Sequence, residues 1–257
     1  FSSAASDVYK RQIQDGWLLG HSDAADNNGI FYKYVSYLQI ENGTSWIGLS
    51  NGQLLLIDDF SKSVYPISTS IGVIYPTTIT IDDLIWIGGI RNFSSDNSSI
   101  SAITKNFKDI KNYKDSNYSN FSKADFFSNK SIDNEVWFGS QGSVTIYNKR
   151  SDFFRTLGYE KGIPMQKVEH IEYLNDKVYI ASRNDLVVLD KKTKKIVDSK
   201  LSDLINQNNT FINDMKITSE KIYMILNGKI YVFNKNEKIN TERFKSINNS
   251  TNIERVY

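Results

Sequence analysis

The chain has 257 residues, with 31 basic and 29 acidic side chains, two histidines and no cysteine. Hydrophobic residues make up 40% of it and aromatic residues 13%, which is too apolar a composition for a disordered chain. The absence of cysteine excludes disulfide scaffolds and thiolate metal sites, and the nearly neutral charge gives no reason to expect nucleic acid as a partner. Abundant Tyr, Phe and Ile favour β-strands.

The first twelve residues differ in character from the rest. Residues 2–12 read SSAASDVYKRQ, which resembles the in-frame translation of a transposase-based sequencing adapter; the alternative is a polar N-terminal tail. We therefore predict that residues 1–12 are foreign, that the native chain starts near Ile13 and that it belongs to a longer protein. The longest apolar run, 84–90, is much shorter than the roughly 20 residues of a membrane-spanning helix, so no membrane segment is expected in this stretch.

The rest of the chain is organised as a repeat. An aromatic residue, an apolar residue and a small residue recur in order, with a degenerate last copy, at spacings of 40, 51, 42 and 44 residues. Periods of this length built from short strands are typical of β-propeller blades. The copies are Trp46-Ile47-Gly48, Trp86-Ile87-Gly88, Trp137-Phe138-Gly139, Tyr179-Ile180-Ala181 and Tyr223-Met224-Ile225.

Each repeat predicts four antiparallel strands. Most aromatic strands are followed by a turn pair suited to positive φ (51–52, 141–142, 184–185 and 227–228) and then by an apolar strand (54–58, 144–148, 186–190 and 230–234). An inner strand precedes the aromatic strand (35–40, 168–174 and 212–217), and an edge strand follows a charged turn (64–67, 153–157 and 195–198). We expect the aromatic residue to pack between blades and the small residue to allow close approach of a strand.

These patterns divide the native chain into blades at about 35–67, 73–113, 121–157, 167–199 and 211–244, with a partial unit at 13–34 and the start of another at 251–257. The predicted fold is an all-β, incomplete propeller of about five blades, because closed propellers have 4 to 8 blades. The longest interval between aromatic residues of the repeat, from Trp86 to Trp137, is explained by a polar insertion at 92–99 and an extended loop at 113–122.

At this point the chain resembles the two-component regulator propeller repeats of bacterial hybrid sensor proteins. The resemblance rests on Trp46-Ile47-Gly48, the Asn51-Gly52 turn, Asp58 at the end of the next strand, and Gly162-Ile163-Pro164, and it covers roughly 35–244. Tyr179 and Tyr223 depart from the Trp of the pattern, and only one G-I-P segment is present. The resemblance implies an extracytoplasmic sensor domain, in the periplasm or at the cell surface, that relays a signal to a membrane segment and a kinase.

The sequence offers little catalytic chemistry. It lacks the common phosphate-binding and nucleophile-elbow motifs, and two histidines without cysteine make a zinc site a poor expectation. We predict no cofactor and no metal. The segment 21–29 has carboxylate and amide oxygens suited to Ca²⁺, but it lacks the order of a calcium loop, so a polar hairpin loop is favoured. The basic run 191–195 is predicted to be a solvated turn rather than a nucleic-acid patch.

Six polar residues of the inner strands are the candidate ligand-binding residues. Three of them stand nine residues before an aromatic residue of the repeat, and the other three follow two positions later; they are Tyr37, His170 and Asp214, and Gln39, Glu172 and Lys216. If they point towards one mouth of the central channel, they can bind an oligosaccharide or another polar ligand. The alternative, which we favour, is that they form hydrogen bonds between strands, because buried polar groups need partners.

Three functions follow, in order of preference. The first is a non-catalytic sensing propeller that is the input domain of a two-component-type signalling protein. The second is a secreted or surface interaction propeller, such as a component of a secretion apparatus or an adhesin-like scaffold, and a protein partner or a dimer through the propeller faces is possible. The third is a propeller lyase or hydrolase whose acid and base come from different blades, with His170 and Glu172 as candidates.

Overall fold

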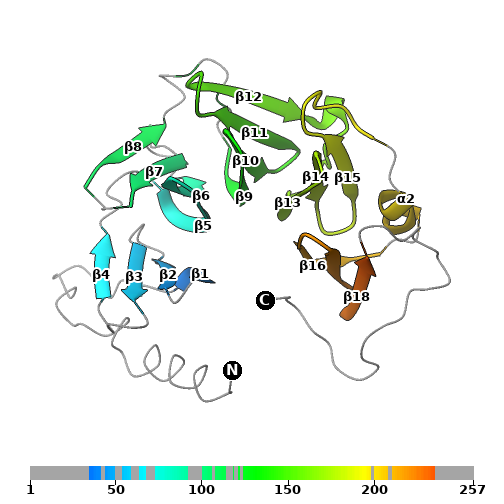
Figure 1. The fold of residues 1–257 in the computed structure, drawn as a ribbon, viewed down its shortest axis with the longest axis horizontal. Coiled ribbons are helices and arrows are strands. Elements are labelled where there is room, and N and C mark those ends of the chain that lie inside the picture. The colour runs from blue at the N-terminus through cyan, green and yellow to red at the C-terminus, as the bar shows by residue number, and fades with distance from the viewer. Residues whose placement is uncertain are drawn as a thin grey trace.

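A computed structural model describes residues 35–41, 44–49, 54–58, 64–67, 73–91, 100–105, 108–113, 118, 121, 124–197, 200–207 and 210–234. The predicted segments 1–12, 13–34, 92–99 and 251–257 lie outside the described residues, as do the Asn51-Gly52 turn and the loop at 21–29. The described residues form five antiparallel sheets that follow one another around an arc (Figure 1). This is the predicted all-β propeller architecture, and the first and last sheets do not close on each other.

The five sheets are called blades 1 to 5, and each is ordered as the chain runs. Blades 1 to 3 each have four strands, and blades 4 and 5 have three strands among the described residues. Blade 1 comprises β1 (Val35–Glu41), β2 (Thr44–Leu49), β3 (Leu54–Asp58) and β4 (Val64–Ile67). Blade 2 comprises β5 (Val73–Ile81), β6 (Leu84–Arg91), β7 (Ile100–Thr104) and β8 (Ile110–Tyr113). Blade 3 comprises β9 (Phe126–Ile132), β10 (Glu135–Ser140), β11 (Ser143–Asn148) and β12 (Phe153–Gly158).

Blade 4 comprises β13 (His170–Leu174), β14 (Lys177–Ala181) and β15 (Leu186–Asp190). Blade 5 comprises β16 (Ile212–Ile217), β17 (Lys221–Leu226) and β18 (Lys229–Asn234). In the described part of the chain, two short helices connect blades: the 3-10 helix η3 (Tyr159–Lys161) precedes blade 4, and α2 (Lys200–Gln207) precedes blade 5.

The aromatic residues of blades 1 to 4 pack between their own blade and the following one, as predicted. Trp86 is completely buried among side chains of blade 3 that include Phe126 and Phe138. Trp137 is likewise completely buried in a cluster with Ile171 and Val178 of blade 4. Burial of aromatic side chains of this size is a main source of stability in a β-protein, so the repeat motif holds neighbouring blades together.

The small residue of the motif marks the closest approach between blades. A Cβ atom built on Gly48 would lie 2.9 Å from Cβ of Pro76 in blade 2, and one on Gly139 would lie 2.6 Å from Cγ1 of Val168. Real Cβ atoms do not approach other atoms so closely. The prediction that a small residue lets a strand approach closely is therefore confirmed. At Gly48 the approaching strand is β5, the inner strand of the next blade.

Two local predictions hold only in part. The described part of the predicted edge strand 195–198 pairs with β15 through the antiparallel bridge between Leu189 and Ile196 and two flanking backbone hydrogen bonds, and α2 covers the rest of that edge. The Asn184-Asp185 turn does not use positive φ, although Gly142 and both residues of the Asn227-Gly228 turn do (φ 69°, 51° and 73°).

Candidate functional site

The candidate site lies on the innermost strand of each blade. Figure 1 shows β1, β5, β9, β13 and β16 as the strands nearest the centre of the arc, and each contacts the next one along the chain. Because side chains alternate along a strand, residues two positions apart share one side of the sheet. The register of each inner strand with the aromatic strand thus defines two equivalent positions per blade.

The first position faces the small residue of the motif, and we call its residues the glycine row. The second position faces the aromatic residue, and we call its residues the aromatic row. The glycine row is Tyr37, Thr78, Ser128, His170 and Asp214. The aromatic row is Gln39, Thr80, Lys130, Glu172 and Lys216.

The glycine row connects each blade to the next. Tyr37 donates a hydrogen bond from Oη to the carbonyl oxygen of Ile79 in blade 2 at 3.4 Å. Ser128 donates from Oγ to the carbonyl oxygen of Val168 at 2.7 Å. Nδ1 of His170 lies 3.5 Å from Oδ1 of Asp214 in blade 5. At these three positions the polar side chain contacts the next blade, which is the structural alternative to ligand binding.

The aromatic row carries a chain of charges across blades 3, 4 and 5. Lys130 donates from Nζ to Oε2 of Glu172 at 2.7 Å. Nζ of Lys216 lies 3.8 Å from the other carboxylate oxygen of Glu172. The Glu172 side chain is only 8% exposed, whereas that of Lys130 is 30% and that of Lys216 is 52% exposed. One nearly buried carboxylate is thus shared by two lysines that remain partly in solvent.

The structure therefore brings four of the six predicted residues together and separates the other two from them. His170, Glu172, Asp214 and Lys216 form one cluster on β13 and β16, while Tyr37 contacts blade 2. Gln39 lies on β1 opposite Trp46; its side chain is outside the described part of the structure. Whether any of these residues binds a ligand stays a prediction.

Sequence reasoning missed Lys130, although a signal was present. Ser128 stands nine residues before Trp137, as Tyr37, His170 and Asp214 stand before their own aromatic residues, and Lys130 follows two positions later. In blade 2 the aromatic residue comes one position earlier, so Thr78 and Thr80 fall outside the nine-residue rule.

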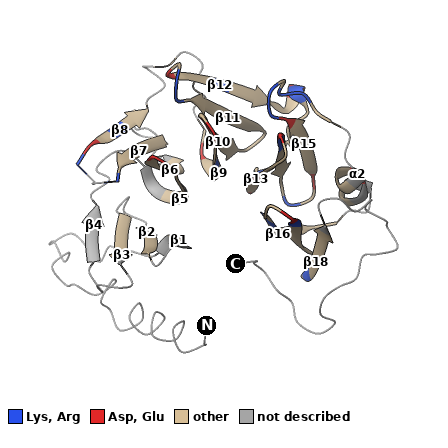
Figure 2. Ribbon diagram, viewed as in Figure 1, with Lys and Arg blue, Asp and Glu red and all other residues tan. Residues whose placement is uncertain are grey.

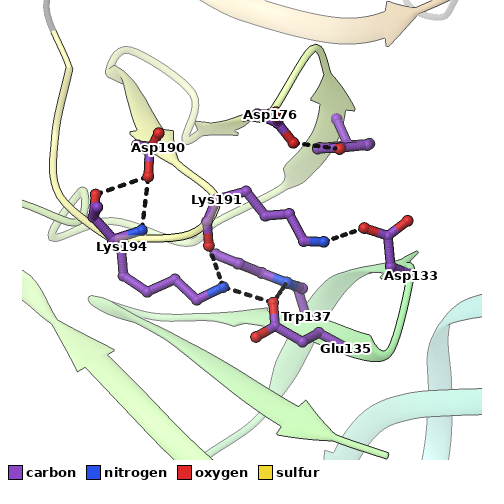
Figure 3. Close-up of polar contacts among 9 residues, drawn as sticks. Asp133, Glu135, Trp137, Asp176, Asp190, Lys191 and Lys194 are labelled. Carbon is purple, nitrogen blue, oxygen red and sulfur yellow. Dashed lines mark hydrogen bonds and ion pairs between the residues drawn. The ribbon is translucent and has the colours of Figure 1, made fainter.

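A second polar cluster links blades 3 and 4 near the charged turn 191–195 (Figure 3). Lys194 donates from Nζ to Oε2 of Glu135 at 2.6 Å and lies 4.5 Å from the ring centre of Trp137. The indole Nε1 of Trp137 donates to the same oxygen at 3.1 Å, and Lys191 pairs with Asp133. Burial lowers the pKa of the Lys194 ammonium, although Glu135 opposes the shift. Two lysines of the predicted solvated turn therefore act as contacts between blades.

The same arrangement recurs between blades 2 and 3. Asp82 accepts hydrogen bonds from Nε1 of Trp86 at 3.1 Å and from Nζ of Lys149 at 2.8 Å. In both clusters a carboxylate near the tryptophan of one blade binds a lysine from the turn after the third strand of the next blade. Figure 2 shows basic and acidic residues interspersed over the described blades, so these turns do not make a surface of one sign.

The described residues contain no group of three or more His, Asp or Glu side chains that could hold a metal ion. Among them there is also no helix that is long and apolar enough to cross a membrane. Nε2 of His170 is buried, which is unfavourable for a general base that must reach a polysaccharide.

Comparison with known proteins identifies the fold. No protein-family model and no curated protein matches the chain. Among solved structures, the chain is similar to the extracellular domain of BT3049 from B. thetaiotaomicron, assigned as a hybrid two-component system, with 13% identity and a TM-score of 0.62. That match covers 92% of this chain and 31% of the other.

Two further similarities agree. The extracellular domain of BT4673 from B. thetaiotaomicron, assigned as a one-component system, matches with 14% identity and a TM-score of 0.53, covering 78% of this chain and 28% of the other. The WD40 β-propeller domain of Doa1 matches with 12% identity and a TM-score of 0.58, covering 79% and 65%. The solved structures thus include extracellular domains of the kind that the sequence resembles. At these identities the likeness shows a β-propeller fold, and the chain spans about a third of the first match.

Proposed function

We propose that this chain is part of an extracytoplasmic sensing propeller, the input domain of a two-component-type signalling protein. The observation that carries the proposal is the match to the extracellular domain of BT3049 over 92% of the chain. The aromatic-strand and G-I-P residues that resemble sensor propeller repeats support the same function independently of the structure.

The cluster of His170, Glu172, Asp214 and Lys216 is the ligand-binding region in this proposal. It lies on the inner strands of two adjacent blades, where groups from separate repeats converge on one small area. Rigid strands hold such groups in place better than loops do. A polar ligand with several hydrogen-bonding groups, such as an oligosaccharide, suits the charged side chains of Glu172 and Lys216, while the contact between His170 and Asp214 joins the two inner strands.

The proposal is tested by determining the gene sequence on both sides of this region from a library made without a transposase adapter. We expect native codons in place of residues 2–12, further aromatic-strand repeats, a membrane-spanning helix and a kinase domain. A surface-sorting module, or a stop codon after one closed ring without a membrane helix, would instead favour an interaction propeller that binds a protein partner or dimerises.

Enzymatic activity is a separate question, and we propose a non-catalytic domain. The proteins matched by structure are named as extracellular domains of signalling systems and as a WD40 domain. Polysaccharide cleavage by the purified protein that is lost on substitution of His170 or Glu172 would establish the lyase or hydrolase alternative.

A further inference from the structure

The aromatic row of blades 3 to 5 has more positive than negative groups. Lys130 and Lys216 approach different oxygens of the single carboxylate of Glu172, at 2.7 Å and 3.8 Å. Asp214 belongs to the glycine row, where Oδ1 is engaged by His170 and accepts a hydrogen bond from the backbone N–H of Met215 at 2.8 Å. One carboxylate therefore serves two ammonium groups within the row.

The three charges also differ in their access to solvent. The carboxylate of Glu172 belongs to a side chain that is 8% exposed, while the lysine side chains are 30% and 52% exposed. A ligand that approaches the inner strands meets the ammonium groups before it meets the carboxylate. The partly buried setting strengthens an attraction between charges relative to water.

Lys216 is the least constrained member of the row. The lysines that join other blades, Lys149 and Lys194, have side chains that are 20% and 8% exposed and lie within 2.8 Å of a carboxylate oxygen. Lys216 is half exposed, and its separation from Glu172 is longer than a hydrogen bond. Its flexible stem lets the ammonium group turn towards a new partner at little cost.

We propose that Lys130 and Lys216 bind an anionic group of the ligand, with Glu172 drawing the two ammonium groups towards each other between blades. This proposal rests on the ligand-binding role proposed above, and it names the chemistry of the ligand: a small molecule that carries a carboxylate or a sulfate. It also adds Lys130, in blade 3, to the residues of the site.

The test is calorimetric titration of the full chain, at low ionic strength, with α-1,4-linked digalacturonate and with α-1,4-galactobiose, its neutral counterpart. We expect digalacturonate to bind at least about ten-fold more tightly, and its affinity to fall with added salt because the contact is electrostatic. If sodium sulfate competes with digalacturonate, the site recognises the anion alone. If sodium sulfate does not compete, the site recognises a carboxylate carried by a sugar.

The decisive variant is Lys216→Gln. Because the Lys216 side chain is half exposed, we expect this variant to fold normally, which circular dichroism can check. We expect it to weaken digalacturonate binding about ten-fold and to leave galactobiose binding unchanged. The matched control is Lys177→Gln, an exposed lysine at the start of β14, which should bind like the unmodified protein.

The proposal is overturned if both disaccharides bind equally, if Lys216→Gln binds digalacturonate as the unmodified protein does, or if digalacturonate does not bind. Equal binding of the two disaccharides would leave the sensing function intact and remove only the anionic ligand. The signalling role fails separately, if the complete gene has no membrane segment and no kinase domain.

Discussion

At the scale of single residues, the third position of the repeat motif sets how closely blades can pack. A Cβ atom on Gly139 would lie 2.3 Å from Oγ of Ser128 and 2.8 Å from the carbonyl oxygen of Val168. These atoms belong to a hydrogen bond between blades 3 and 4. Blade 4 has Ala181 at the equivalent position, so the tight contact is a property of particular interfaces.

Gly139→Ala should therefore destabilise the protein by about 1–3 kcal/mol through overpacking. Chemical denaturation of the full chain by urea measures the loss. Ala181→Gly is the reciprocal control, and it should cost only about 0.5–1 kcal/mol through backbone entropy. A neutral Gly139→Ala variant would show that blades 3 and 4 are not packed as described.

The pair of Lys130 and Glu172 is expected to contribute more to stability than an exposed pair. Lys130→Met removes the closest cation of a nearly buried carboxylate and should cost about 2–3 kcal/mol, towards the lower end for a buried pair because Lys130 is partly exposed. Lys192→Met, which removes an exposed pair with Asp176 at 3.8 Å, should change stability by less than about 1 kcal/mol. Equal effects of the two substitutions on urea denaturation would contradict this difference.

At the scale of elements, α2 completes the outer edge of blade 4. The backbone N–H of Leu186 on β15 donates to Oδ1 of Asn206 at 3.0 Å, and Nδ2 of Asn206 donates to the carbonyl oxygen of Leu186 at 3.2 Å. Leu201 and Ile205 are buried in the core beside blade 5. The side-chain amide of Asn206 thus bonds both the N–H and the C=O of Leu186, the two groups that a fourth strand would bond at this position. This protects a strand edge that would otherwise favour aggregation.

Asn206→Leu keeps the approximate size of the side chain but removes both hydrogen bonds. We expect a loss of about 1–2 kcal/mol and faster hydrogen exchange at the amide of Leu186, measured by NMR or mass spectrometry. Asp203→Asn on the same helix is the control and should leave that amide unchanged. If hydrogen exchange at this amide is unaltered in Asn206→Leu, another group accepts the hydrogen bond from the backbone N–H of Leu186.

The contact of blades 2 and 3 through Asp82 should depend on pH. Burial alone would raise the pKa of Asp82, but hydrogen bonds from Leu84, Lys149 and Ser131 together hold it below its ordinary value of 3.8. The ionised carboxylate therefore stabilises the fold above the ordinary pKa, and this stabilisation is lost as the pH falls through the lowered pKa.

Asp82→Asn should accordingly destabilise the protein at pH 7 and have a smaller effect at pH 2. Thermal unfolding of both proteins across this range measures the difference. Asp83→Asn, at the neighbouring exposed residue, is the control and should change the thermal stability at pH 7 much less than Asp82→Asn does. If the difference in unfolding temperature between Asp82→Asn and the unmodified protein stays constant with pH, the effect comes from side-chain shape and not from charge.

At the scale of the whole molecule, the repeat made the architecture predictable. Trp46, Trp86 and Trp137 recur because each must fill the same space between blades, and this shared constraint leaves a period in the sequence. The helix α2 was not predicted: the expected edge strand ended at 198, and no element was assigned to 200–207, although the buried residues Leu201 and Ile205 are four positions apart, as on one face of a helix.

The site was only partly predictable, because its contacts join different blades. Spacing from the aromatic residue placed His170 and Asp214 at equivalent positions, but the contact between their side chains depends on how blade 4 sits against blade 5. The inner strand of blade 5 also has an irregular register between Ile212 and Asp214, which periodicity does not reveal. Lys130 could have been found by applying the same spacing to every repeat.

A sensing role predicts that ligand binding changes phosphorylation of the full-length gene product, which can be measured in membrane vesicles. Digalacturonate and mixed neutral oligosaccharides would be applied to the extracytoplasmic side of the unmodified protein, of Lys216→Gln and of Lys177→Gln. We expect digalacturonate to change kinase phosphorylation in the unmodified protein and in Lys177→Gln, and Lys216→Gln to require about ten-fold more of it. If none of these sugars alters phosphorylation of the unmodified protein, the sensing role is wrong.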